Sequence, residues 1–145
     1  MPSMLQRASA PFSAAGRECL LEARDVRHQF GRGVHTRQVL RGVSIGLRGG
    51  ELALLMGPSG SGKTTLLSIL GCMLKPSAGS VHVNGEATSL LSPGRLSDLR
   101  RRQIGFIFQS FNLLPTLTAE ENVRIALDIR GETGGAAVMA ALKTL

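Results

Sequence analysis

The feature that most constrains this 145-residue chain is a glycine-rich stretch from Gly57 to Thr65. It fits the pattern G-x-x-x-x-G-K-[ST], which is typical of a loop that holds nucleotide phosphates. The glycines can take positive φ, so successive backbone N–H groups can point inward and form a nest for an anion. Lys63 can reach the β and γ phosphates, and the Thr64 hydroxyl is a candidate Mg²⁺ ligand. The predicted phosphate-binding residues are Gly57, Pro58, Ser59, Gly60, Ser61, Gly62, Lys63, Thr64 and Thr65.

The flanks of this loop favour a phosphate site over an ordinary glycine-rich turn. Residues 52–56 form a short apolar run that predicts a buried strand. After the loop, apolar residues follow at helical spacing, namely Leu66, Leu67, Ile69, Leu70, Met73 and Leu74. A helix that begins at the loop would add unpaired N–H groups and a partial positive charge to the phosphate site.

Composition indicates one globular domain and excludes several function classes. Hydrophobic residues make up 43% and charged residues 19% of the chain. No apolar run approaches the roughly 18 residues that span a bilayer, so we expect no membrane crossing by this chain itself. The net charge of +7 could suit nucleic acid, but there is no Trp or Tyr to stack on bases. Cys19 and Cys72 lack metal-ligand spacing and are predicted to be reduced cytosolic thiols.

The remaining patterns predict a small antiparallel layer followed by helices. Residues 19–26 and 39–47 are predicted strands, and residues 80–83 form a short strand that ends in the hairpin-type turn Asn84-Gly85. Residues 95–103 have a helical face. Thr118 and Glu121 form a capping box that opens a helix ending near Gly131, and a further helical pattern follows it. Residues 1–18 are predicted to be a disordered N-terminus, with a transit peptide as the less favoured alternative.

Gln109 is a second candidate site residue, because it stands at the end of the apolar run 104–108, a predicted strand. In an open α/β sheet, ligands bind outside the carboxyl ends of the strands, where Gly57 would also lie. The amide oxygen of Gln109 could coordinate Mg²⁺ or accept a hydrogen bond from a metal-bound water. Its position alone leaves a functional role and a plain turn position equally open.

Together these motifs resemble the N-terminal part of the nucleotide-binding subunit of an ABC transporter. The resemblance covers roughly residues 20–145 and rests on the phosphate loop, on residues 104–114, which are similar to the family's Q-loop, and on residues 39–44, which are similar to the strand before the loop. The sequences of these motifs most resemble those of exporters of the lipoprotein-release, macrolide-efflux and glycolipid-export group. The resemblance implies an α/β fold: an incomplete P-loop NTPase-type core with an N-terminal antiparallel β layer and the start of a helical subdomain.

The resemblance also implies roles, cofactors and partners. Phe30 would stack on adenine, Thr64 would bind Mg²⁺, and Gln109 would sense Mg²⁺ and the attacking water, with ATP and Mg²⁺ as cofactors. The implied partners are an integral membrane permease and a second nucleotide-binding subunit, without nucleic acid, at the cytoplasmic face of the membrane. Phe111, Leu113 and Leu114 would either contact the permease or anchor their own loop in the core.

The chain departs from the family pattern after Gln109. It has no L-S-G-G-Q signature, no apolar strand that ends in Asp-Glu, and no switch histidine. We therefore expect residues 19–145 to be a truncated ABC-type nucleotide-binding domain that binds MgATP weakly and hydrolyses it negligibly. Two hypotheses remain: an incomplete ATP-binding subunit that powers an export permease, or a non-hydrolysing nucleotide-binding remnant or gene fragment with no independent role. Whether this chain is an enzyme stays open. A nucleic-acid-dependent NTPase is a third and least favoured hypothesis.

Overall fold

The computed structural model describes residues 19–31, 33–110, 112–132 and 134–143. The chain divides into two compact units, residues 1–96 and 97–145, and each is described here by itself. The predicted disordered segment 1–18 and the candidate contact residue Phe111 lie outside the described residues.

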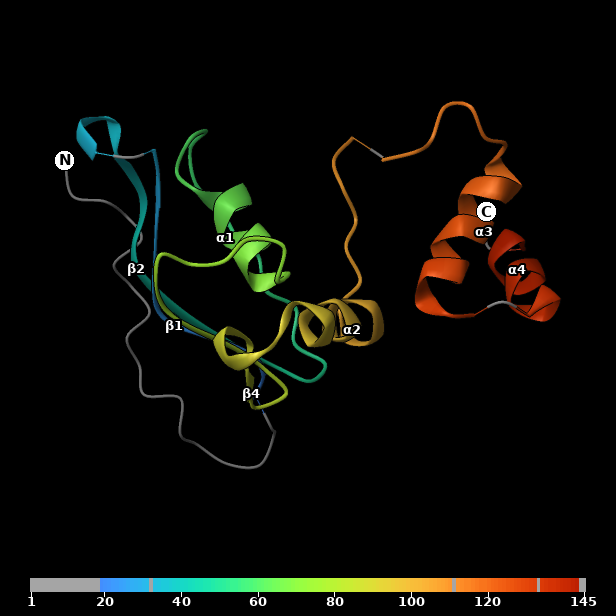
Figure 1. Ribbon diagram of the computed structural model, residues 1–145, viewed down its shortest axis with the longest axis horizontal. Helices are drawn as coiled ribbons and strands as arrows, with labels where there is room; N and C mark the ends of the chain where they lie inside the picture. Colours follow the sequence, from blue (N-terminus) through green and yellow to red (C-terminus); the bar gives the residue numbers. More distant parts are fainter. Residues whose placement is uncertain (1–18, 32, 111, 133, 144–145) are drawn as a thin grey trace. The chain divides into compact units, whose positions relative to one another are not determined.

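The first unit is built on an antiparallel sheet. Its strands are β1 (Cys19–Phe30), β2 (Arg37–Arg48), β3 (Ala78–Val83) and β4 (Glu86–Ala87), in the order β2-β1-β3-β4 (Figure 1). A short 3₁₀ helix, η1 (Gly33–His35), lies between β1 and β2. The register pairs Ala23 with Ile45 on one side of β1 and with Val81 on the other. The predicted antiparallel β layer is therefore confirmed, and both long strands extend beyond their predicted ends.

The hairpin between β3 and β4 follows from its turn residues. Asn84 and Gly85 both have positive φ, 49° and 79°. A two-residue turn of this kind matches the right-handed twist of the flanking strands. A second 3₁₀ helix, η2 (Thr88–Leu90), comes next, and the Thr88 hydroxyl donates a hydrogen bond to the Val81 carbonyl at 3.1 Å.

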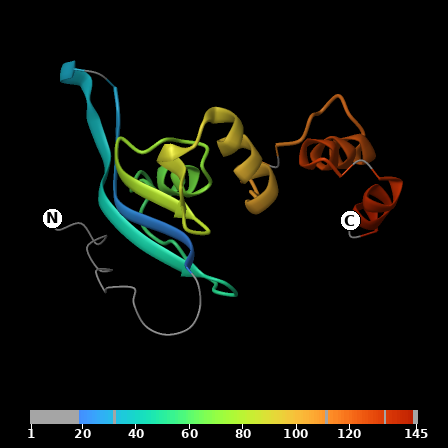
Figure 2. The ribbon, with the colours of Figure 1, turned by 60° about the horizontal axis from the view of Figure 1, so that its bottom comes forward.

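Helix α1 (Lys63–Leu70) completes the core of the first unit. In Figure 2 the green α1 lies against one face of the sheet. Apolar side chains at helical spacing on α1 meet those that alternate along the strands. The core consists of Ala23, Val26, Leu40, Leu66, Ile69, Leu70 and Val81. The helix ends at Leu70, earlier than the apolar spacing through Leu74 predicts.

Two predicted strands are absent from the structure. Residues 52–56 and 104–108 have no regular secondary structure, and neither run joins the sheet of the described residues. Leu52 is 97% exposed and Ile107 98% exposed. The prediction of a buried strand at either place is wrong for this structure, because an apolar run becomes a strand only when neighbouring strands accept its backbone hydrogen bonds.

The helices of the chain's last third follow local sequence signals. Helix α2 (Pro93–Gln103) carries an ion pair between Asp98 and Arg101 at 2.9 Å, whereas the spacing suggests Arg102 as the partner. Helix α3 (Ala119–Arg130) begins with the predicted capping box and ends at Gly131, whose φ is 82°. Helix α4 (Gly135–Leu142) follows. Within the described residues, no helix has both the length and the apolar content for a membrane span.

Candidate phosphate-binding site

The glycine-rich loop lies between residues 51–56, which have no regular secondary structure, and the first turn of α1. Gly60 and Gly62 have φ of 77° and 93°, a region that L side chains avoid. Within the loop, the Ser61 amide donates a hydrogen bond to the Pro58 carbonyl at 3.3 Å. The backbone therefore turns tightly just before the helix, as the phosphate-loop pattern predicts.

Position 62 also requires glycine because the backbone there lies very close to β2. A Cβ atom at this position would lie 2.9 Å from Cδ2 of Leu40 and 3.1 Å from Cγ1 of Val39. Real Cβ atoms essentially never come within 3.0 Å of another heavy atom, so a larger residue would have to displace the strand side chains or the loop. The sheet thus fixes where α1 begins.

The start of α1 suits an anion. Gly62 provides no side-chain cap, and no acidic residue lies in the first turn. The first intrahelical bond that involves Gly62 runs from the Leu66 amide to its carbonyl at 2.8 Å. The amides of the first turn have no partner within the helix, and they point toward its N-terminal end with a partial positive charge.

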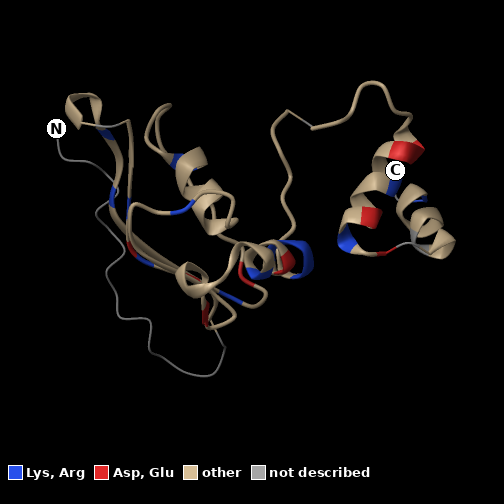
Figure 3. Cartoon of the chain, in the orientation of Figure 1, with Lys and Arg blue, Asp and Glu red and all other residues tan. Residues whose placement is uncertain are grey.

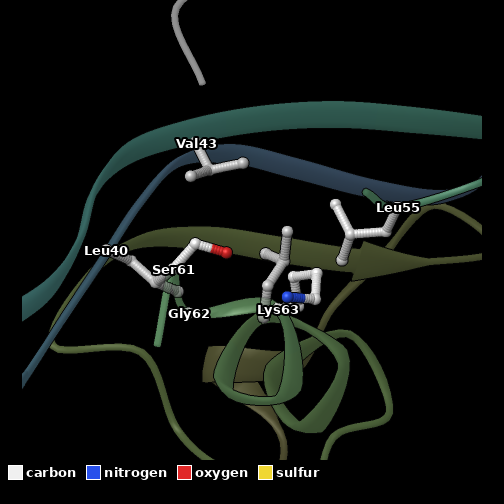
Figure 4. Close-up of a pocket in the computed structure, with 7 residues that line it drawn as sticks. Leu40, Val43, Leu55, Ser61, Gly62 and Lys63 are labelled. Carbon is white, nitrogen blue, oxygen red and sulfur yellow. The ribbon is translucent and has the colours of Figure 1, made fainter. Parts of the chain in front are cut away.

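Lys63 brings a full positive charge to the same place. Its Nζ donates hydrogen bonds to the carbonyls of Gly57 and Pro58 at 2.7 and 2.8 Å. The ammonium group therefore lies over the loop, and the oxygens of a phosphate group could compete with these neutral carbonyls for it. Figure 4 shows the lysine among the residues around a small pocket at the base of the loop, lined by Leu40, Val43, Leu55, Ser61, Gly62, Lys63 and Leu66.

The other predicted residues of the loop are accessible. Pro58, Ser59 and Thr64 are exposed, and Thr65 is half-buried. Thr64 lies in the first helical turn beside Lys63, and its role as a metal ligand stays a prediction. A glycine cradle, an uncapped helix start and one lysine fit a polyphosphate with its Mg²⁺ ion. Figure 3, in which Lys and Arg positions are coloured blue along the ribbon, has a blue segment at the start of this helix.

Phe30 and Gln109 lie in different units of the structure. Phe30 is the last residue of β1 in the same unit as the loop, and the residue is 48% exposed. Gln109 is exposed in a turn of the second unit, and its place beside the phosphate loop stays a prediction. Sequence reasoning missed His28, whose ring contacts Phe30. Side chains alternate along a strand, so residues 28 and 30 lie on one face, and this spacing could have indicated the contact.

The fold and the loop define a phosphate-loop domain of the α/β class. A family model described as ABC transporter matches residues 40–145. The chain therefore belongs to the ABC transporter family, and it contains part of that family's ATP-binding domain.

Curated relatives and solved structures agree with this assignment. The chain is 49% identical over 106 residues to a "Macrolide export ATP-binding/permease protein MacB" of Marinobacter nauticus, which covers 73% of this chain and 16% of that protein. It is 46% identical over 112 residues to an "Uncharacterized ABC transporter ATP-binding protein" of Thermotoga maritima, over 77% of this chain and 48% of that protein. The chain thus spans less than half the length of either relative.

The fold is shared with a solved ABC cassette. The dimeric bacterial ABC transporter cassette MJ0796 matches with a TM-score of 0.78 and 38% identity, over 85% of this chain and 54% of that chain. A second structure of MJ0796, with the same scores, is bound to ADP and Pi in a post-hydrolysis state. The predicted fold class, α/β with an N-terminal antiparallel layer, is confirmed.

Proposed function

We propose that this chain is the ATP-binding part of an ABC-type export system, in which MgATP binding at the phosphate loop powers a membrane permease. The observation that carries the proposal is the arrangement of Gly60, Gly62 and Lys63 at the uncapped start of α1. The names of the macrolide-export relatives support an exporter. The proposed partners are a permease and a second nucleotide-binding subunit, and the proposed location is the cytoplasmic face of the membrane, reached through the permease.

Each site residue has a role in this proposal. The backbone N–H groups from Gly57 to Thr65, except at Pro58, which has none, hold the phosphate oxygens. Lys63 exchanges its two carbonyl partners for the β and γ phosphates. Thr64 offers a metal ligand, and the exposed Phe30 stacks on the adenine. The proposed role of Gln109 is to sense Mg²⁺ and the attacking water. Thr64 would help to hold Mg²⁺, which would supply positive charge to offset that of the phosphate groups.

A second candidate is a nucleotide-binding module without turnover. It uses the same glycine-rich loop and Lys63, whose contacts suit the binding of a polyphosphate whether or not it is cleaved. Phosphoryl transfer depends on positioned charges and an oriented water, so binding can persist where hydrolysis does not. Steady-state phosphate release by the purified chain separates the two candidates, and turnover that Lys63→Ala abolishes would exclude the second.

Equilibrium binding of MgATP tests the site itself. Lys63→Ala should weaken binding by roughly tenfold or more, because a charge-assisted hydrogen bond to phosphate contributes about 1.5–3 kcal/mol. Lys75→Ala is the matched control, since Lys75 is an exposed lysine in the connection after α1, and it should change the affinity less than about twofold. Circular dichroism checks that both variants fold. Equal ATP affinity in the Lys63 variant and the unsubstituted chain would contradict the proposal.

A further inference from the structure

His28 stands out because its burial has no explanation in the roles assigned so far. Among the polar and charged residues that the structure describes, it is the one that is buried, with 7% of its surface exposed. A polar ring is costly to bury unless its nitrogens find partners or the ring performs another task. His28 lies in β1 two residues before Phe30, the residue proposed to stack on the base of the nucleotide.

The His28 ring packs against the Phe30 ring. The two ring centroids are 4.6 Å apart, and the planes meet at 77°. This edge arrangement is one that aromatic rings prefer over a face-to-face stack. Phe30 is nevertheless 48% exposed, so the contact with His28 leaves much of its surface open.

Ser77 forms hydrogen bonds to this part of β1. Its amide donates to the Arg27 carbonyl at 2.8 Å, and its Oγ accepts a hydrogen bond from the Gln29 amide at 3.2 Å. The same Oγ lies 3.5 Å from Nδ1 of His28, at the outer edge of hydrogen-bond range. Ser77 belongs to the connection that leaves α1, so this connection is bonded to β1 immediately before Phe30.

We propose that His28, supported by Ser77, is a positioning residue that orients the Phe30 ring for stacking on the base of the nucleotide. The inference rests on the proposed role of Phe30 in nucleotide binding. An exposed aromatic ring that is already oriented loses less rotational freedom when a base stacks on it. Removing His28 should therefore weaken the part of the affinity that comes from the base and leave the phosphate part unchanged.

A fluorescent reporter tests the contact without any nucleotide. The chain has no Trp and no Tyr, so Phe30→Trp introduces a single indole at position 30. With His28 present, time-resolved anisotropy should show little fast local motion of this indole. In the double variant with His28→Ala, the amplitude of fast motion should rise by roughly twofold or more, since the edge contact is lost. Equal amplitudes in the two proteins would overturn the proposal.

Binding of ATP and of inorganic tripolyphosphate, which has no base, tests the consequence. His28→Ala should weaken ATP binding by roughly two- to tenfold and leave tripolyphosphate binding unchanged. His28→Phe, which keeps an aromatic edge, should restore ATP affinity, whereas His28→Asn, which keeps only a polar group, should not. His82→Ala is the matched control, because His82 lies on β3 opposite Glu22.

The outcomes separate this proposal from the proposed function. If His28→Ala weakens ATP and tripolyphosphate equally, or if His28→Asn restores ATP affinity as well as His28→Phe does, His28 has only a structural role. If the unsubstituted chain shows no Lys63-dependent ATP binding, the proposed function fails, while the anisotropy measurement still decides whether His28 orients the ring at position 30.

Discussion

Two apolar regions of the first unit differ sharply in their structure. The sheet and α1 bury the apolar side chains that face each other, as Val26 at 0% and Ile69 at 1% exposure show. Residues 52–56 are just as apolar, yet Leu52 and Leu54 are 97% and 80% exposed. The difference teaches that hydrophobic sequence alone does not bury a segment. Burial also requires partners that can accept both its side chains and its backbone hydrogen bonds.

The pairing partners available to each segment explain which region joins the sheet, and β3 pairs antiparallel with β1 although the two are far apart in sequence. Strands β1 and β2 pair antiparallel across a short connection, and β3 and β4 pair across two residues. Parallel strands need crossover connections of a dozen or more residues, so their pairing depends on distant parts of a chain. Residues 52–56 are typical of such a strand, and no described strand lies beside them in the sheet.

The largest expected effect comes from truncating the buried region. Ile69→Ala should lower the free energy of unfolding by about 2–5 kcal/mol, through lost apolar burial and the cavity left in the core. Leu52→Ala is the matched truncation in the exposed region and should change it by less than about 0.5 kcal/mol. Urea denaturation of both variants measures the difference. Equal losses would mean that residues 52–56 are packed in solution, and the contrast between the two regions would be wrong.

Local signals in the sequence predict most of the regular structure. Alternation predicts the long antiparallel strands, Asn84-Gly85 predicts the hairpin turn, and the Thr118 capping box places the start of α3. The strands at 52–56 and 104–108 could not be decided this way, because an apolar run states that a segment can be buried but does not name its partner.

The candidate site shows the same division. The phosphate loop is contiguous in sequence, so its pattern predicts the glycine conformations and the start of α1. The contact of His28 with Phe30 and Ser77 joins residues that are up to 49 positions apart, and only the folded chain brings them together. The position of Gln109 relative to the loop depends on the placement of two units and stays a prediction.

Glycine substitutions sharpen the contrast at the loop itself. Gly62→Ala should destabilise the first unit by about 1–3 kcal/mol, because alanine is strained at φ of 93° and its Cβ would overlap Leu40. Gly60→Ala has the same left-handed strain without a close neighbour, so it should cost only about 1–2 kcal/mol.

Gly94→Ala is the matched control for both loop variants. Gly94 lies in helix α2, and its added Cβ would meet no atom within 4 Å. This substitution should be neutral or stabilise the helix by about 0.5–1 kcal/mol. Thermal unfolding gives the order of the three variants. A Gly62 variant as stable as the Gly94 variant would contradict the close approach of the loop to β2.

The start of α3 tests whether a local signal is sufficient in the second unit. The Thr118 hydroxyl accepts a hydrogen bond from the Glu121 amide at 3.3 Å, and Thr118→Ala should destabilise the helix by about 1 kcal/mol. Amide hydrogen exchange in residues 119–123 should become faster. Thr116→Ala, at an exposed position before the cap, is the control and should leave exchange unchanged. Equal exchange in all three proteins would show that α3 is held by something other than its cap.

The smallest expected effect is a pH dependence of the same cap. Hydrogen bonds from the Thr118 amide and then from its hydroxyl lower the pKa of Glu121 below its ordinary value. Since the folded pKa is the lower one, the stabilisation is fully present above the ordinary glutamate pKa and is lost as the pH falls through the folded pKa.

Glu121→Gln keeps an acceptor for the Thr118 amide but cannot titrate in this range. Following the chemical shifts of residues 119–123 by NMR during acidification, the unsubstituted helix should fray at its start, and the Glu121→Gln helix should fray less. Glu120→Gln, which removes an exposed carboxylate paired with Arg124, should behave like the unsubstituted chain at this end of the helix; fraying that follows Glu120 instead would assign the pH dependence to that ion pair.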